Sequence, residues 1–209
     1  MTDAQTLLLF FATSVALALA PGPDNLFVLT QSALHGRRAG WLVTLGLCSG
    51  LVVHTGAVAL GVAAVFQTSA LAFDLLKGVG AAYLVWLAWQ AWRAGAGTLP
   101  SGEAAAMPAA RALYLRGIAM NVSNPKVAIF FLAFLPQFAD PRRGSLGGQI
   151  VVLGGLFMLA ALLVFGAIAW AAGRIGGWLR GSPHAQVMMN RVAAGMFLAL
   201  AGRLALSSR

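Results

Sequence analysis

The sequence predicts an all-α integral membrane protein, with six transmembrane helices arranged as two inverted three-helix repeats. Hydrophobic residues make up 60% of the 209 residues and charged residues only 9%, whereas an average soluble domain carries about 25% charged residues. The apolar residues gather in six runs, each near the roughly 20 residues that a helix needs to cross a bilayer. Two of these runs are interrupted by proline, at matching places in the two halves of the chain.

The six runs follow one another with little chain left over. They cover residues 6–34, 41–66, 71–92, 113–138, 147–172 and 187–206. We therefore treat residues 1–209 as a single transmembrane domain. Its first repeat spans about 5–93, a polar loop covers about 94–112, and its second repeat spans about 113–206.

Basic residues between the runs predict the orientation, because cytoplasmic loops are enriched in Lys and Arg. With the N-terminus outside, the cytoplasmic segments hold Arg37, Arg38, Arg93, Arg111, Arg116, Arg174 and Arg180, and the outer segments hold Arg142, Arg143 and Arg209. We expect both termini to lie on the outer side of the membrane. The net charge of +9 is explained in this way, and the absence of a basic tract gives no reason to expect nucleic-acid binding.

Two similar stretches support the repeat. A Pro-Asp-Asn motif ends at Asn25 and is followed by an apolar stretch, a pair of arginines and a Gly-rich run. An Asn-Pro-Lys motif ends at Lys126 and is followed by the same succession. Because three spans per repeat is an odd number, the second half must be inverted relative to the first, as in many secondary transporters.

Proline breaks the first and the fourth helix. A proline removes a backbone donor and clashes with the preceding turn, so Pro21, Gly22 and Pro23 end one helix and start another at Pro23 or Asp24. Pro125 does the same in the fourth run. Within hydrocarbon, the freed backbone groups must be satisfied by protein or by a watery cavity. The two breaks therefore predict a shared central cavity.

The polar residues at the breaks suit an amino-acid zwitterion. A carboxylate fits the N-terminal ends of the half-helices, to which Lys126 can add a positive charge. An ammonium group fits Asp24 or the free carbonyls that precede the first break. Asn25, Asn121 and Asn124 can both donate and accept hydrogen bonds.

Each charged residue also has a structural interpretation. Asp24 can simply cap its half-helix, although Asn would cap as well at a lower insertion cost. Lys126 can be a counter-ion for Asp24 or a lysine that snorkels to the surface. His54 is either a hydrogen-bonded packing residue or a proton-relay partner of Asp24. Asp74 and Lys77, three residues apart, are expected to pair near the membrane surface.

Other classes of protein lack support in the sequence. Metal transport or a metal site favours clustered ligands, but His35, His54 and His184 are scattered and Cys48 is the only cysteine. No metal and no cofactor is expected. The sequence contains no HExxH and no GxSxG motif, so we do not expect an enzyme.

Motifs around both breaks carry a resemblance to a known family. Pro21 to Asn25, Asn121 to Lys126 and the stretch Gly80-Ala81-Ala82-Tyr83-Leu84 resemble the lysine-exporter (LysE) superfamily, in particular its threonine/homoserine-exporter (RhtB-type) branch. The resemblance covers essentially the whole chain. It implies secondary active export of amino acids or their analogues across the bacterial inner membrane by proton antiport. The alternative that it implies is export of metal ions or other small solutes.

Two spacings of small residues leave the oligomeric state open. Gly46 and Gly50, and likewise Gly144 and Gly148, are four residues apart, which lets helices approach closely. The sequence does not decide whether they do so within one protomer or in a homo-oligomer.

Overall fold

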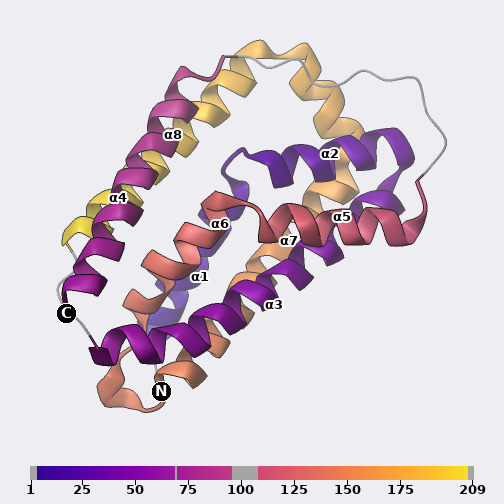
Figure 1. Ribbon diagram of the computed structural model, residues 1–209. Helices are drawn as coiled ribbons and strands as arrows, with labels where there is room; N and C mark the ends of the chain where they lie inside the picture. The colour runs from indigo at the N-terminus through magenta and orange to yellow at the C-terminus, as the bar shows by residue number, and fades with distance from the viewer. Residues whose placement is uncertain (1–3, 69, 96–107, 207–209) are drawn as a thin grey trace.

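Helices make up every regular element of the part of the chain that the structure describes. The computed structural model describes residues 4–68, 70–95 and 108–206 (Figure 1). The elements are α1 (Ala4–Leu19), α2 (Pro23–His35), α3 (Arg37–Thr68), α4 (Ala70–Arg93), α5 (Ala110–Val122), α6 (Pro125–Ile129), the π-helix η1 (Phe130–Phe134), the 3-10 turns η2 (Leu135–Phe138) and η3 (Pro141–Arg143), α7 (Leu146–Gly181) and α8 (Pro183–Leu206). The all-α prediction is confirmed. Most of the expected polar loop, and Arg209, lie outside the described residues.

The described helices include three to five candidate membrane spans, judged by length and composition. α3, α7 and α8 each contain a stretch that is long and apolar enough to cross a bilayer alone, and two bent helix pairs pass the same test when each pair is taken as one span. α4, which carries Asp74, Lys77 and Gln90, is not among these five. The protein is thus an apolar helical bundle, and its division into six spans and two inverted repeats remains a prediction.

Both predicted breaks are present. α1 and α2 meet at an angle of 61°, and α5 meets the segment Pro125–Phe138 at 50°. α2 begins at Pro23 and α6 at Pro125, so proline occupies the first helical position in each case, where its missing donor costs nothing. We call the two junctions the first elbow (Ala20–Asp24) and the second elbow (Ser123–Lys126).

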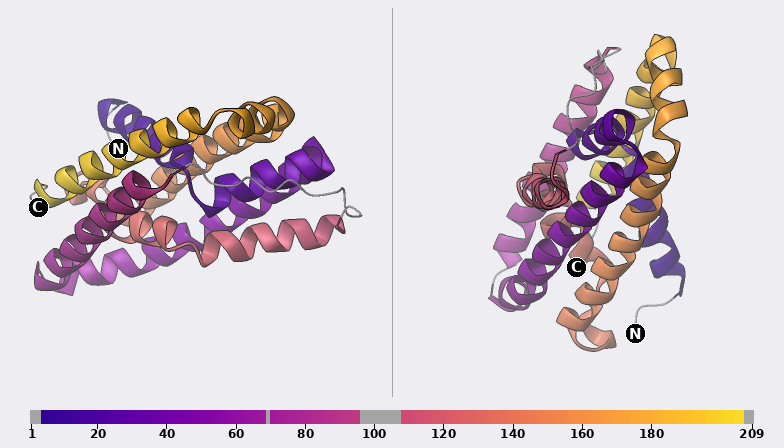
Figure 2. Two further views of the ribbon diagram at one scale, coloured as in Figure 1. Left: turned by 90° about the horizontal axis from the view of Figure 1, so that it is seen from above. Right: turned by 90° about the vertical axis from the view of Figure 1, so that its right-hand side faces the viewer.

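The helices form two groups. α3 packs along α5 and α7, and α1 and α2 pack against α7, which together with α6 makes a central body. α4 pairs with α8 at one side of this body and contacts it chiefly through η1 (Figure 1 and the left view of Figure 2). The start of α1 and the end of α8 lie toward the same end of the molecule.

A phenylalanine cluster anchors the second elbow in the central body. The ring of Phe130 lies 4.9 Å from that of Phe134 and 5.2 Å from that of Phe157, measured between centroids. Phe10 of α1 joins the cluster, with its ring 5.0 Å from that of Phe138. The segment after Pro125 is therefore fixed by aromatic packing on both sides.

Small residues join α3 to α5 within one protomer. A side chain at Gly46 would collide with the backbone of α5 at Tyr114 and Gly117, and a Cβ at Gly50 would lie 2.7 Å from the Cβ of Asn121. The first of the two glycine spacings is thus used inside the protomer, and it places Asn121 of α5 directly against α3.

Large apolar side chains cover the outer surface of the molecule. Leu8 is 70% exposed, Leu60 82% and Trp170 60%. In water such a surface would drive association, whereas lipid chains solvate it without cost. The distribution agrees with a membrane environment.

Candidate functional site

Asp24 lies at the second position of α2, immediately after the first elbow. Its side chain is buried, with 2% exposure. Its carboxylate faces the side-chain amides of Asn121 and Asn124 and lies within electrostatic range of Lys126 and His54. Atom Oδ1 has no hydrogen-bond partner among the described residues. The residue does not cap its helix, because α2 has no side-chain cap at all. Asp24 is therefore a buried acid with two amide neighbours and one carboxylate oxygen that no described residue satisfies, which is unusual for a buried polar atom.

Lys126 holds the corresponding place in the other broken helix, the second position of α6. It is 7% exposed, which excludes the snorkelling interpretation. Its Nζ donates hydrogen bonds to the main-chain carbonyls of Ala20, at 3.1 Å, and Leu17, at 3.5 Å. The Leu17 carbonyl belongs to the last turn of α1 and the Ala20 carbonyl to the first residue of the first elbow, and the break removes the helical donors of both. The lysine of one elbow therefore completes the hydrogen bonding of the other.

Three asparagines surround these two charges. Asn124 caps α6, since its Oδ1 accepts a hydrogen bond from the main-chain N–H of Lys126 at 3.0 Å. Asn25 donates from Nδ2 to the carbonyl of Ala18 at 2.7 Å. The remaining atoms, Asn25 Oδ1, Asn121 Oδ1 and Asn124 Nδ2, have no partner among the described residues. The structure thus brings the predicted polar residues together with unused acceptors and an unused donor.

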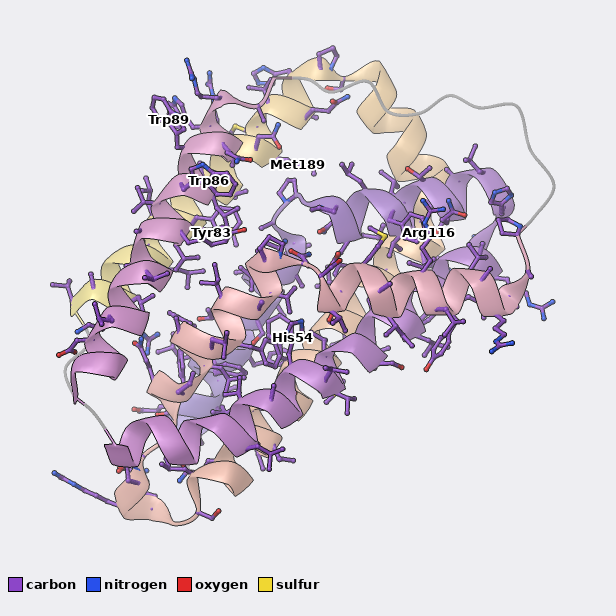
Figure 3. All side chains as sticks on the ribbon, viewed as in Figure 1. His54, Tyr83, Trp86, Trp89, Arg116 and Met189 are labelled. Atoms are coloured by element: carbon purple, nitrogen blue, oxygen red, sulfur yellow. The ribbon has the colours of Figure 1, made fainter. Side chains whose placement is uncertain are left out.

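His54 of α3 reaches the second elbow. Its Nε2 lies 3.1 Å from the main-chain carbonyl of Asn121, and its ring lies 5.6 Å from that of Phe131 (Figure 3). Asn121 therefore lies between His54 and Asp24: its backbone carbonyl contacts the imidazole, and its side chain faces the carboxylate.

A cavity of about 640 Å³ opens beside the elbows, between the central body and the α4–α8 pair. One wall contains the elbow residues Pro21, Gly22, Pro23, Asn124, Pro125 and Lys126. Tyr83 and Trp86 on the facing side of α4 form the opposite wall, whereas Trp89 points away from it (Figure 3). All four residues predicted to break the helices therefore line the cavity.

Two cavity residues were not predicted from the sequence. Gln90 of α4 and Asn190 of α8 line the wall that faces the elbows. Asn190 donates to the carbonyls of Ala94 and Gly95, both at 3.2 Å, and so ties α8 to the end of α4. In the sequence, each of these residues is a neutral amide inside an apolar run. Such an amide is costly to bury without a hydrogen-bond partner, and this feature could have marked both residues.

Asp74 and Lys77 lie apart from this site. The Lys77 ammonium is 3.9 Å from the Asp74 carboxylate, and the Asp74 side chain is 64% exposed. The predicted pair is confirmed. In the described part of the chain, no three His, Cys, Asp or Glu side chains are grouped closely enough to hold a metal ion.

These features define a helical membrane protein in which two broken helices bring one buried acid and one buried lysine together beside a cavity. The chain belongs to the LysE type translocator family, which it matches over residues 15–208.

Relatives within this family include proteins named for efflux. The chain is 36% identical to a homoserine/homoserine lactone efflux protein of Salmonella typhimurium, over 96% of this chain and 95% of the relative. It is 35% identical to an uncharacterized membrane protein of Vibrio cholerae, over 94% of each chain. It is 26% identical to a leucine efflux protein of an Enterobacter species, over 90% of each. No solved structure shows a significant match.

Proposed function

We propose that this protein is a secondary active exporter of amino acids or amino-acid analogues across the bacterial inner membrane. The family and the efflux relatives support export. The observation that carries the substrate class is the buried carboxylate of Asp24, with an unpartnered oxygen, beside the buried ammonium of Lys126. A zwitterion is the kind of solute that satisfies both signs of charge.

The two ends of the substrate have different partners in this proposal. The carboxylate binds at the start of α2, whose first N–H groups have no side-chain cap, and near the unused Nδ2 of Asn124. The ammonium group binds at Asp24, close to the unused oxygen of Asn121. The substrate side chain then extends into the cavity toward Tyr83 and Trp86.

Proton antiport is the proposed coupling. Asp24 holds either a proton or the substrate ammonium, so release of substrate on the outside favours uptake of a proton there. A proton that moves inward down the membrane potential supplies about 2.3 kcal/mol per 100 mV. This free energy supports roughly 50-fold accumulation of a substrate at that potential.

The proposed topology has six spans, with α4 as the third and both termini in the periplasm. In this topology the two broken helices are equivalent members of inverted repeats. Asp24 and Lys126 support the equivalence, because each follows a proline at the first position of its half-helix. Accessibility of single cysteines placed at residues 36 and 144, in a Cys48→Ser background, to an impermeant thiol reagent tests this orientation.

Flux into proteoliposomes tests the function. We expect a pH gradient to drive transport of one or a few labelled amino acids from a panel of threonine, homoserine, leucine, lysine and cysteine. Divalent metal ions, tested in the same vesicles, are expected to show no driven flux. Amino-acid flux that is absent in both gradient directions, while a control transporter is active, would contradict the proposal.

A further inference from the structure

Lys126 separates the large cavity from Asp24. The side chain of Lys126 lines the cavity of about 640 Å³ on one side. On its other side it lines a small void of about 10 Å³, whose wall includes Asp24, Asn121 and Leu17. Asp24 lines this small void and is not part of the cavity wall. Of the residues that line the cavity, Lys126 is the one that also lines the void at Asp24, so movement of its side chain would connect the two spaces.

The hydrogen bonds that hold Lys126 in place join it to backbone carbonyls of the other broken helix. Its ammonium donates to the carbonyls of Leu17 and Ala20, which lie 109 and 106 residues away in the sequence. In hydrocarbon, these carbonyls would be costly without a donor. A Cβ at Gly22 would lie only 3.0 Å from Nζ, so the absence of a side chain there makes room for the ammonium group.

We propose that the Lys126 ammonium is a stand-in for the ammonium group of the substrate. It satisfies the Leu17 and Ala20 carbonyls when no substrate is bound, and a solute with a primary ammonium group displaces it and takes over these carbonyls beside Asp24. This inference rests on the proposed export of amino acids. It adds an ammonium site at the end of α1 and a reason for the position of Lys126.

The exchange is balanced in hydrogen bonds and charge. A primary ammonium group carries three donors, the same number as the lysine head group, so the carbonyls keep their donors throughout. The displaced Lys126 ammonium turns toward the substrate carboxylate, which arrives with the ammonium. A quaternary ammonium ion has no N–H donor and cannot make the exchange. The site therefore selects primary amino acids against fully methylated analogues such as glycine betaine.

Chemical rescue of Lys126→Ala tests the ammonium site directly. The variant opens a space beside the two carbonyls, and propylammonium ions are expected to fill it. We expect propylammonium at ten times its dissociation constant to raise the melting temperature of the full-length variant by roughly 4 °C above an equal concentration of KCl. Tetramethylammonium is expected to give no rise.

Lys126→Met is the matched control. Methionine also removes the charge, but its side chain fills the space, so propylammonium is expected to leave its melting temperature unchanged. An equal response of the Ala and Met variants, or no response of Lys126→Ala, would overturn the inference. Flux of amino acids by the unmodified protein is measured separately. Its absence contradicts the proposed function, whereas flux without rescue contradicts only the ammonium site.

A second measurement on the unmodified protein covers the case in which Lys126→Ala does not fold. The chain contains two lysines, Lys77 and Lys126, so isotope-labelled lysine gives two side-chain NMR signals that Lys77→Arg assigns. L-homoserine, or whichever panel member gives the highest flux, is expected to shift the Lys126 signal and leave that of Lys77 in place. A transported amino acid at saturation that leaves the Lys126 signal unchanged would overturn the inference.

Discussion

The two elbows have the same proline signature but differ in how their free backbone groups are satisfied. At the second elbow, Asn124 caps its own half-helix, and His54 of α3 contacts the carbonyl of Asn121 just before the elbow, so neither contact depends on the first elbow. At the first elbow, α2 has no side-chain cap, and the carbonyls of α1 depend on Lys126 from the other elbow. The first elbow is thus the one whose backbone groups depend on a side chain from the other elbow, and it is where we propose that the substrate binds.

Removal of the lysine should disturb the first elbow most. Lys126→Met takes away the charge and leaves the Leu17 and Ala20 carbonyls without their donor, a loss of about 2 kcal/mol or more. We expect export to fall roughly 30-fold or more, measured as initial flux in proteoliposomes. Lys77→Met serves as the control, because it removes a lysine that pairs with Asp74 apart from the site. Equal flux in the two variants would show that the first elbow does not need Lys126.

A single methyl group at the first elbow should have a smaller effect. Gly22→Ala places a Cβ 3.0 Å from the Lys126 ammonium, so the ammonium must shift by a few tenths of an ångström, and we expect the shift to weaken its hydrogen bond to the Ala20 carbonyl. The backbone tolerates the change, because the φ of Gly22 is −174°. We expect flux to fall about tenfold, which corresponds to roughly 1.4 kcal/mol. Gly56→Ala, where a Cβ meets nothing within 4 Å, is expected to leave flux unchanged.

The variant His54→Gln tests whether His54 is a packing residue or a proton relay. Gln can still donate to the Asn121 carbonyl but does not titrate, so His54→Gln is expected to keep flux within about threefold if the contact at Asn121 is worth an ordinary hydrogen bond. The pH profile of flux should then stay unchanged. A loss of the pH dependence in this variant would instead make His54 a relay for Asp24.

At the second elbow the expected effect is on stability. Asn124→Ala removes the cap of α6, which costs about 1 kcal/mol, or a fall in melting temperature of roughly 2–4 °C. Ser123→Ala is the control, because its hydroxyl bonds only to carbonyls of its own helix, at Ala119 and Met120. Equal melting temperatures of the two variants would show that the Asn124 cap does not stabilise the second elbow, and the proposed difference between the elbows would then be wrong.

Local features of the fold could be predicted from the sequence. Proline chemistry located both breaks and limited the start of the helix after the first break to Pro23 or Asp24, of which the structure has Pro23. The sequence also indicated that Asp24 had a purpose beyond capping, because Asn would have been the less costly cap. These inferences depend on a few neighbouring residues and on the hydropathy of one run.

The arrangement of the helices could not be predicted in the same way. In a membrane, helix packing depends on shape and not on hydrophobicity, so the pairing of α4 with α8 leaves no clear trace in the sequence. For the same reason the contact of Lys126 with α1, and the places of Tyr83 and Asn190 in the cavity wall, emerge only from the structure.

The most direct test of the account is proton-driven flux in Asp24→Asn, with Asp74→Asn as the matched control. Both variants lose one carboxylate, but Asp24 is buried at the first elbow and Asp74 is exposed on α4. We expect Asp24→Asn to lose the response of amino-acid flux to an imposed pH gradient and Asp74→Asn to retain it. Undiminished pH-driven export by Asp24→Asn would contradict the account.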